Sequence, residues 1–258
     1  MKMKGKRRKS MSAKTADMWK RLFSLFATIM ELVVADKRSA EEVADVLQVI
    51  KDKKDFAERF GLRMAYATEA QLAKWARLYN EEFGITLNVS EIKVPEHKEG
   101  FDRLIIVAEG LTPEKIFQAM NKKMPAEENL DNLNEAESVR KADKAYAVWA
   151  RDRVEADEEL KNKSANDLKS EGTNCITLEE RLLLEMMYFQ ETGEHLDVQN
   201  VTLCVGSRYA DGSVLFVHWC GWVNVGKCSP DDPAFGDMSW YTGRKSACSR
   251  LRSRVVVS

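Results

Sequence analysis

The hydrophobic pattern of this chain changes its period near residue 200, and this change constrains the fold more than any other feature. Residues 1–199 are highly charged, and most of their apolar residues recur at helical spacing. Residues 200–258 contain short alternating apolar runs with four of the five cysteines, three of the six tryptophans and six of the thirteen glycines. Such runs, separated by turn residues, are typical of β-strands. The sequence therefore predicts an α+β fold that ends in an antiparallel β module.

Three segments have the capping-box form, in which Ser or Thr is followed three residues later by Glu or Gln. They begin at Ser39, Thr68 and Thr177, and apolar residues at helical spacing follow each of them. We therefore expect a helix after each box, and Gly84 marks the end of the second helix. With the helical spacing that precedes it, the first box predicts a helical hairpin within residues 12–56.

Strand-like segments lie between the second and third boxes. Residues 104–108 form a continuous apolar run, and residues 145–150 form a second strand candidate. Residues 85–94 alternate in two phases, which predicts two strand pieces with a bulge or turn between them. Thr112-Pro113 has the composition of a helix start. The stretch 126–138 carries five acids and no base, and we expect it to be a mobile loop.

These elements predict three domains. A basic tail and helical hairpin occupy residues 1–56, a small α+β unit occupies residues 57–150, and a helix followed by the antiparallel β module occupies residues 151–258. Within the module we expect strands at 201–205, 214–219, 222–227 and 251–257.

Composition and charge exclude several classes of protein. With 44% hydrophobic and 31% charged residues, the chain has the balance of a folded protein rather than a disordered one. The net charge of −1 gives no global signature of polyanion binding, although residues 1–10 carry six Lys or Arg and no acid. Five cysteines are too few for a disulfide scaffold, so we expect mostly reduced thiols and a cytoplasmic location. Export, with a bridge between Cys220 and Cys228 or between Cys204 and Cys248, stays open.

An apolar stretch at residues 22–35 follows the basic start. Glu31 interrupts the stretch, and it is too short to span a membrane, so we expect no transmembrane segment. Its helical spacing favours an amphipathic helix packed on the next helix. A cleaved signal peptide and a membrane-surface helix stay open as alternatives.

No catalytic or metal-binding motif stands out. The three histidines, His97, His195 and His218, are not spaced as metal ligands, and the chain has no CxxC pair. We therefore expect no cofactor and no metal. A non-enzymatic role is favoured, and catalysis stays open.

Three arginines, Arg250, Arg252 and Arg254, alternate along the terminal strand segment. Alternate side chains of a strand lie on one face about 7 Å apart, which is near a phosphate repeat distance. One interpretation is a solvent-facing strand edge protected by charge. The alternative is a nucleic-acid-associated protein that uses these arginines together with the basic segment 2–9.

A frame of residues runs through the C-terminal part of the chain. It consists of residues 206–212 (GSRYADG), then Val214, Val217 and Trp219, then Val223, Val225 and Pro230, and finally LRSR at residues 251–254. With segments 43–52, 100–113, 146–169 and 176–205, about two-thirds of the chain resembles an uncharacterised family that occurs as many divergent copies in small-genome bacteria. Leu215 and Lys227 depart from the frame of that family.

In that family, the positions between the frame residues differ freely from copy to copy. This arrangement is similar to the variable proteins of diversity-generating retroelements, whose C-terminal C-type-lectin-like domains carry diversified binding residues. The resemblance implies a binding function and, by analogy, a lectin-like module. Because alternate side chains of a strand point to opposite faces, one row can stay packed while the other row varies.

The leading hypothesis is a non-enzymatic binding protein whose aromatic-rich C-terminal β surface contacts a protein or a glycan. Trp222 lies on a turn and Trp240 in irregular chain, where large aromatic residues are typical of contact surfaces. A role in the core stays open for these aromatic residues. The candidate contact residues are Tyr209, Ser213, Phe216, His218, Trp222, Asn224, Lys227 and Trp240.

Overall fold

The computed structural model describes residues 62–231 and 251–258, together with residues 24, 26–35, 39–41, 43–44 and 48. The chain divides into two compact units, residues 1–65 and residues 66–258. In the first unit, residues 26–34 are helical and expose the apolar side chains of Phe26, Ile29 and Met30. Much of the expected helical hairpin lies outside the described residues. None of the described helices is long and apolar enough to cross a membrane.

The second unit mixes helices with antiparallel and mixed sheets, so the prediction of the α+β class is confirmed. Its strands form a three-stranded sheet, β1-β4-β9, and a six-stranded sheet, β2-β7-β6-β5-β3 with β8 also paired to β5. The elements in chain order are α4 (Leu62–Phe83), η1 (Val89–Glu91), β1 (Arg103–Val107), α5 (Pro113–Asn121), β2 (Ala126–Glu128), η2 (Leu133–Glu135), β3 (Glu137–Ser138), β4 (Tyr146–Ala150), η3 (Glu158–Leu160), α6 (Ala165–Ser170), α7 (Leu178–Thr192), β5 (Val201–Arg208), β6 (Val214–Trp219), β7 (Val223–Cys228), β8 (Leu251–Ser253) and β9 (Val256–Val257).

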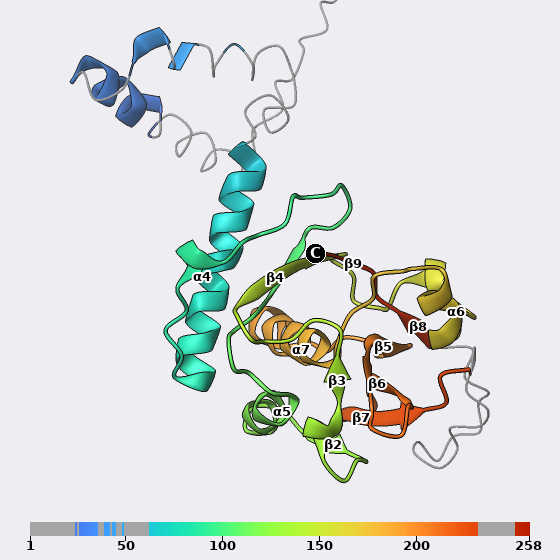
Figure 1. The fold of residues 1–258 in the computed structure, drawn as a ribbon. Coiled ribbons are helices and arrows are strands. Elements are labelled where there is room, and N and C mark those ends of the chain that lie inside the picture. Colours follow the sequence, from blue (N-terminus) through green and yellow to red (C-terminus); the bar gives the residue numbers. More distant parts are fainter. Residues whose placement is uncertain are drawn as a thin grey trace, which may run out of the picture. The chain divides into compact units, whose positions relative to one another are not determined.

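Helix α7 is the centre of this unit (Figure 1). It contacts β1 of the smaller sheet as well as β5 and β6 of the larger one, and every residue from Leu178 to Met187 is buried. The predicted capping box is confirmed, because Thr177 Oγ1 accepts a hydrogen bond from the Glu180 N–H and the Glu180 carboxylate accepts one from the Thr177 N–H. Gly193 ends the helix in the left-handed conformation, at φ 74°. Local capping therefore fixes the ends of the helix on which both sheets pack.

The outer edge of β1 is closed by side chains of helix α4 rather than by another strand. Gln71 accepts a hydrogen bond from the Leu104 N–H at 2.8 Å, and the Trp75 indole donates to the Leu104 carbonyl at 2.9 Å. The Tyr79 hydroxyl donates to the Ile106 carbonyl at 2.7 Å. Trp75 and Tyr79 also pack in the main core. One face of α4 therefore both fills the core and provides hydrogen-bond partners for the main chain at the edge of β1.

Two sequence predictions for the middle of the chain are wrong. Residues 85–94 contain the short helix η1 and no strand. The acidic stretch 126–138 is not a mobile loop, because β2 pairs in parallel with β7 and β3 pairs antiparallel with β5. Main-chain pairing and the burial of Leu133 hold the stretch in place, while its acidic side chains face solvent.

The predicted terminal strand and the predicted domain boundary also differ from the structure. Residues 251–257 form two strands, β8 and β9, that belong to different sheets. The boundary expected between residues 150 and 151 is absent, because residues 66–258 form one compact unit. Strands from both sides of that position pair with each other: β9 pairs with β4, and β2 pairs with β7.

Candidate functional site

The row of side chains expected to face solvent on β6 and β7 is buried. Phe216 is 1% exposed, His218 5% and Asn224 2%, so the predicted exposure of this row is wrong. The reason is that the larger sheet has a core on each face. Phe216 packs in a small core with Leu160 and residues of α6 and β5, while the opposite row packs in the main core with α7.

The other candidate contact residues lie in different places. Tyr209 is buried, and the Lys227 ammonium lies 4.2 Å from the centre of its ring. Ser213 and Trp222 are half-buried and Lys227 is exposed, whereas Trp240 lies outside the described residues. Asp211 brings two of these residues together, because its carboxylate accepts hydrogen bonds from the Ser213 N–H and the Lys227 ammonium. No single exposed surface therefore unites the predicted set within the described part of the chain.

His218 and Asn224 face each other across β6 and β7. The two side chains interact with each other in the interior of the sheet, where both residues are buried. Burial lowers the pKa of His218, which favours the neutral ring. This pair therefore belongs to the interior of the sheet rather than to an exposed contact surface.

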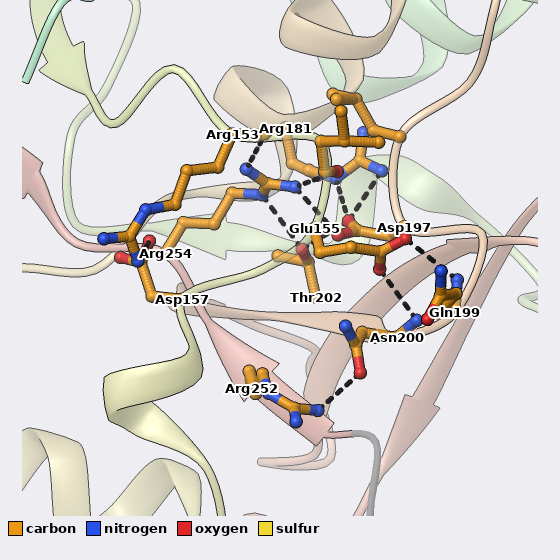
Figure 2. A network of polar contacts seen from close by, with 12 residues as sticks. Arg153, Glu155, Asp157, Arg181, Asp197, Gln199, Asn200, Thr202, Arg252 and Arg254 are labelled. Atoms are coloured by element: carbon orange, nitrogen blue, oxygen red, sulfur yellow. Dashed lines mark hydrogen bonds and ion pairs between the residues drawn. The ribbon is translucent and has the colours of Figure 1, made fainter.

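The predicted arginine stripe is also buried. Arg252 is 5% exposed and Arg254 is 1% exposed, so neither belongs to a solvent-facing edge; Arg250 lies outside the described residues. Arg252 donates hydrogen bonds to the Glu158 carboxylate and the Asn200 amide oxygen. Figure 2 shows its link to Asn200 and the separate set of contacts around Arg254. Arg252 and Arg254 of the LRSR segment thus bind the C-terminal segment to other parts of the same chain.

Arg254 belongs to an ion network centred on Asp197 (Figure 2). The Asp197 carboxylate accepts hydrogen bonds from Arg254 at 2.8 Å, Arg181 at 2.9 Å and Thr202 at 2.5 Å, and Arg181 also donates to Glu185 at 2.8 Å. Burial by itself would raise the pKa of Asp197, but Arg254 and Arg181 outweigh burial and lower it. The two arginines and two carboxylates balance in charge. We interpret the network as a structural joint between α7, β5 and the C-terminal segment.

The frame residues 206–208 position the start of α7. A Cβ atom at Gly206 would lie only 2.8 Å from the Cys175 carbonyl oxygen, so β5 approaches this loop too closely for a side chain. Ser207 Oγ accepts a hydrogen bond from the Leu178 N–H at 2.8 Å, and Arg208 donates to the carbonyl oxygens of Val205 and Ser207. The frame therefore has a structural explanation that does not involve a ligand.

An open groove of about 770 Å³ lies beside β4, and we name it the β4 groove. Sequence reasoning did not find it, because its lining comes from separate segments that no local pattern connects. Its lining residues are Lys93, Pro95 and Glu96; Arg140, Lys141, Asp143 and Lys144; Ala145, Tyr146 and Ala147; and Ser258.

The charges of the β4 groove differ in their availability. Arg140 is neutralised, because its guanidinium makes two hydrogen bonds to the Glu180 carboxylate at 2.6 and 2.9 Å. Lys93, Lys141 and Lys144 are exposed, and within the described part of the chain they form no ion pair. The acids Glu96 and Asp143 are exposed as well. The accessible rim therefore carries three positive and two negative groups.

Groups suited to metal binding do not gather in the part of the chain that the structure describes. No three His, Cys, Asp or Glu side chains there are placed to hold a metal ion. No disulfide joins Cys175, Cys204 or Cys220 within the described residues, and Cys248 lies outside them. Burial raises the pKa of the Cys204 thiol, which disfavours the nucleophilic thiolate.

Comparison with known proteins returns no match for this chain: no family model, no curated protein and no solved structure is similar to it.

Proposed function

We propose that this chain is a non-enzymatic binding protein and that the β4 groove holds part of a partner polypeptide. The observation that carries the proposal is the groove itself, whose volume of about 770 Å³ lies within the range of about 300–1,000 Å³ typical of ligand sites. Its lining combines residues of β4 with three exposed lysines and two exposed acids. Such a lining offers main-chain and charged groups to a partner. Its described residues contain no nucleophile that is hydrogen-bonded to a base.

The position of the groove separates it from the residues that serve the fold. Phe216, His218, Asn224, Arg252 and Arg254 are buried, so a partner meets none of them on the surface of the folded chain. A polypeptide is favoured here because the lining surrounds the half-buried Pro95, Ala145 and Tyr146 with exposed charged side chains, a combination typical of protein–protein contact surfaces.

The test is a selection of random linear peptides, displayed on phage, against the folded protein. Selected peptides are then synthesised and mixed with a variant that carries a photo-crosslinking residue in place of Lys144, which lines the groove. The matched control carries the same residue in place of Lys169, an exposed lysine of α6. We expect crosslinking at position 144 and not at position 169, with competition by the unlabelled peptide.

Two outcomes overturn the proposal. One is a selection that yields no peptide crosslinked at position 144. The other is preferential binding of single-stranded RNA or of glycans at position 144, which assigns the groove to a different class of partner. Both variants are first required to unfold at the temperature of the original protein, so that a loss of folding is not mistaken for a loss of binding.

A further inference from the structure

We propose that the helix over residues 26–34 binds the surface of an anionic lipid bilayer, with its apolar face among the acyl chains and the basic segment 2–9 at the headgroups. The helix belongs to the first unit, whereas the β4 groove belongs to the second, so this proposal is independent of the proposed function. It depends on the two faces of the helix and on the charge of the first unit.

The apolar side chains of the 26–34 helix share one face. Four of them stand at i, i+3, i+4 and i+7, which is the spacing of a single helical stripe: Phe26, Ile29, Met30 and Val33. Three of the four are exposed, at 44% for Phe26, 39% for Ile29 and 41% for Met30. Exposed apolar side chains that adjoin one another mark interaction sites, whereas single ones need no explanation. The stripe is therefore a candidate interaction surface.

The opposite face of the same helix is polar. Ser24, Thr28 and Glu31 stand at i, i+4 and i+7 and lie on the side of the helix away from the apolar stripe. Thr28 donates its hydroxyl hydrogen to the Ser24 carbonyl at 3.1 Å, so this face satisfies part of its polar groups within the helix. A helix with opposed apolar and polar faces fits the boundary between lipid headgroups and acyl chains.

The charge of the first unit selects an anionic surface. Residues 1–65 carry sixteen Lys or Arg against nine Asp or Glu, although the whole chain has a net charge of −1. Six of the sixteen lie within residues 1–10, which contain no acid. Basic clusters beside an amphipathic helix are attracted to negative headgroups and strengthen its binding to the bilayer.

The acids of this part of the chain do not oppose that attraction. The acids that precede Glu41 are single residues well separated in the sequence: Asp17, Glu31 and Asp36. Glu31 lies on the polar face of the helix, where it points away from the lipid when the apolar stripe is buried.

Two other occupants each account for only one of the two features. A nucleic acid would bind the basic segment through its phosphates but would give the apolar stripe no role. A second copy of the helix would cover the apolar stripe but would give the basic segment no role. An anionic bilayer offers acyl chains to the stripe and negative headgroups to the basic segment, so we favour it.

The experiment mixes the full chain with vesicles of phosphatidylcholine, either alone or together with phosphatidylserine, and separates bound protein by flotation. At low salt we expect binding to the vesicles with phosphatidylserine to be at least roughly tenfold tighter, because their surface is negative. Added salt should weaken this binding, since it screens the basic segment.

Matched variants test the two features separately. Replacing Phe26, Ile29 and Met30 together by serine should weaken binding to the vesicles with phosphatidylserine at least roughly tenfold. Its control replaces three exposed apolar residues of the second unit by serine and should leave binding unchanged: Val139, Val154 and Val198.

The charge variant is Arg7→Gln with Arg8→Gln, which should weaken binding at least roughly fivefold. The control Lys122→Gln with Lys169→Gln changes the net charge equally at exposed positions of the second unit and should leave binding unaltered.

A photo-crosslinking residue reports the orientation of the helix without removing the apolar stripe. In place of Ile29 it should crosslink to lipid, whereas in place of Thr28, on the polar face, it should not. Absence of flotation, equal binding to both kinds of vesicle, or equal lipid crosslinking at positions 28 and 29 overturns the proposal. Crosslinking at position 29 to a second protein chain overturns it in favour of self-association. RNA that displaces the vesicles and binds the triple serine variant undiminished overturns it in favour of a nucleic acid.

Discussion

Replacement of Asp197 by asparagine tests whether the buried ion network stabilises the fold. The substitution keeps the shape of the side chain but removes one of two negative charges, which leaves Arg181 with Glu185 and Arg254 without a carboxylate partner in the network. Breaking a buried pair by removal of one partner costs about 3–5 kcal/mol, because the remaining charge stays desolvated and unpaired. A small folded protein has only about 5–15 kcal/mol in total, so this is a large share of the stability.

Urea unfolding followed by circular dichroism measures the effect. With a urea slope of about 2 kcal/mol per molar, a loss of about 4 kcal/mol moves the midpoint down by about 2 M. The matched control is Asp211→Asn, which breaks the exposed contact with Lys227 and should leave the midpoint close to that of the original protein.

A second substitution identifies the cause of the loss. Replacing Arg254 by methionine in the Asp197→Asn background restores the balance of buried charge, so the two changes together should cost less than the sum of their separate costs, by about 1 kcal/mol or more. A midpoint shift below about 0.5 M for Asp197→Asn alone would refute the reasoning. Additive costs would show that packing, rather than charge, accounts for the loss.

Three further predictions concern acid unfolding and the β6–β7 pair. Because the pKa of Asp197 is lower in the folded state, its stabilisation is present above its ordinary value of 3.8 and is lost as the pH falls through the folded value; Asp197→Asn should therefore flatten the dependence of unfolding free energy on pH between about 5 and 2. Phe216→Ala should cost about 3–5 kcal/mol in urea unfolding, against less than about 0.5 kcal/mol for Ser213→Ala, and equal small effects would contradict the observed burial. Gly226→Ala places a Cβ atom 2.4 Å from the Phe216 ring and should cost about 1–3 kcal/mol. Part of that loss should return when Phe216 is also replaced by leucine, and no recovery of the melting temperature would show that the clash is not the cause.

Local features of the chain were predicted where one segment contains all the interacting groups. The capping box at Thr177, the proline start of α5 after Thr112 and the left-handed Gly84 depend on residues within one helical turn. The start of α4 was not predicted, since the helix begins at Leu62, upstream of the Thr68 box.

The exposure of side chains was beyond the sequence, because alternation does not reveal what packs on the second face. Phe216 and Val217 alternate on β6, yet each joins a different core. Arg252 and Arg254 have the alternation of a charged edge, yet partners distant in the sequence, Glu158 and Asp197, bury and neutralise them. A period of two distinguishes the two faces of a strand but does not say which of them is exposed to solvent.

The sequence by itself determined the α+β class, several helix ends and the strands of the C-terminal hairpin, because capping, turns and hydrophobic periods act over a few residues. Only the tertiary structure decided that α7 lies between two sheets and that β8 and β9 separate. These features depend on hydrogen bonds and contacts between segments that lie as much as a hundred residues apart, such as Arg254 with Arg153 and Val154. No local pattern encodes such partners, since many pairings satisfy the same period.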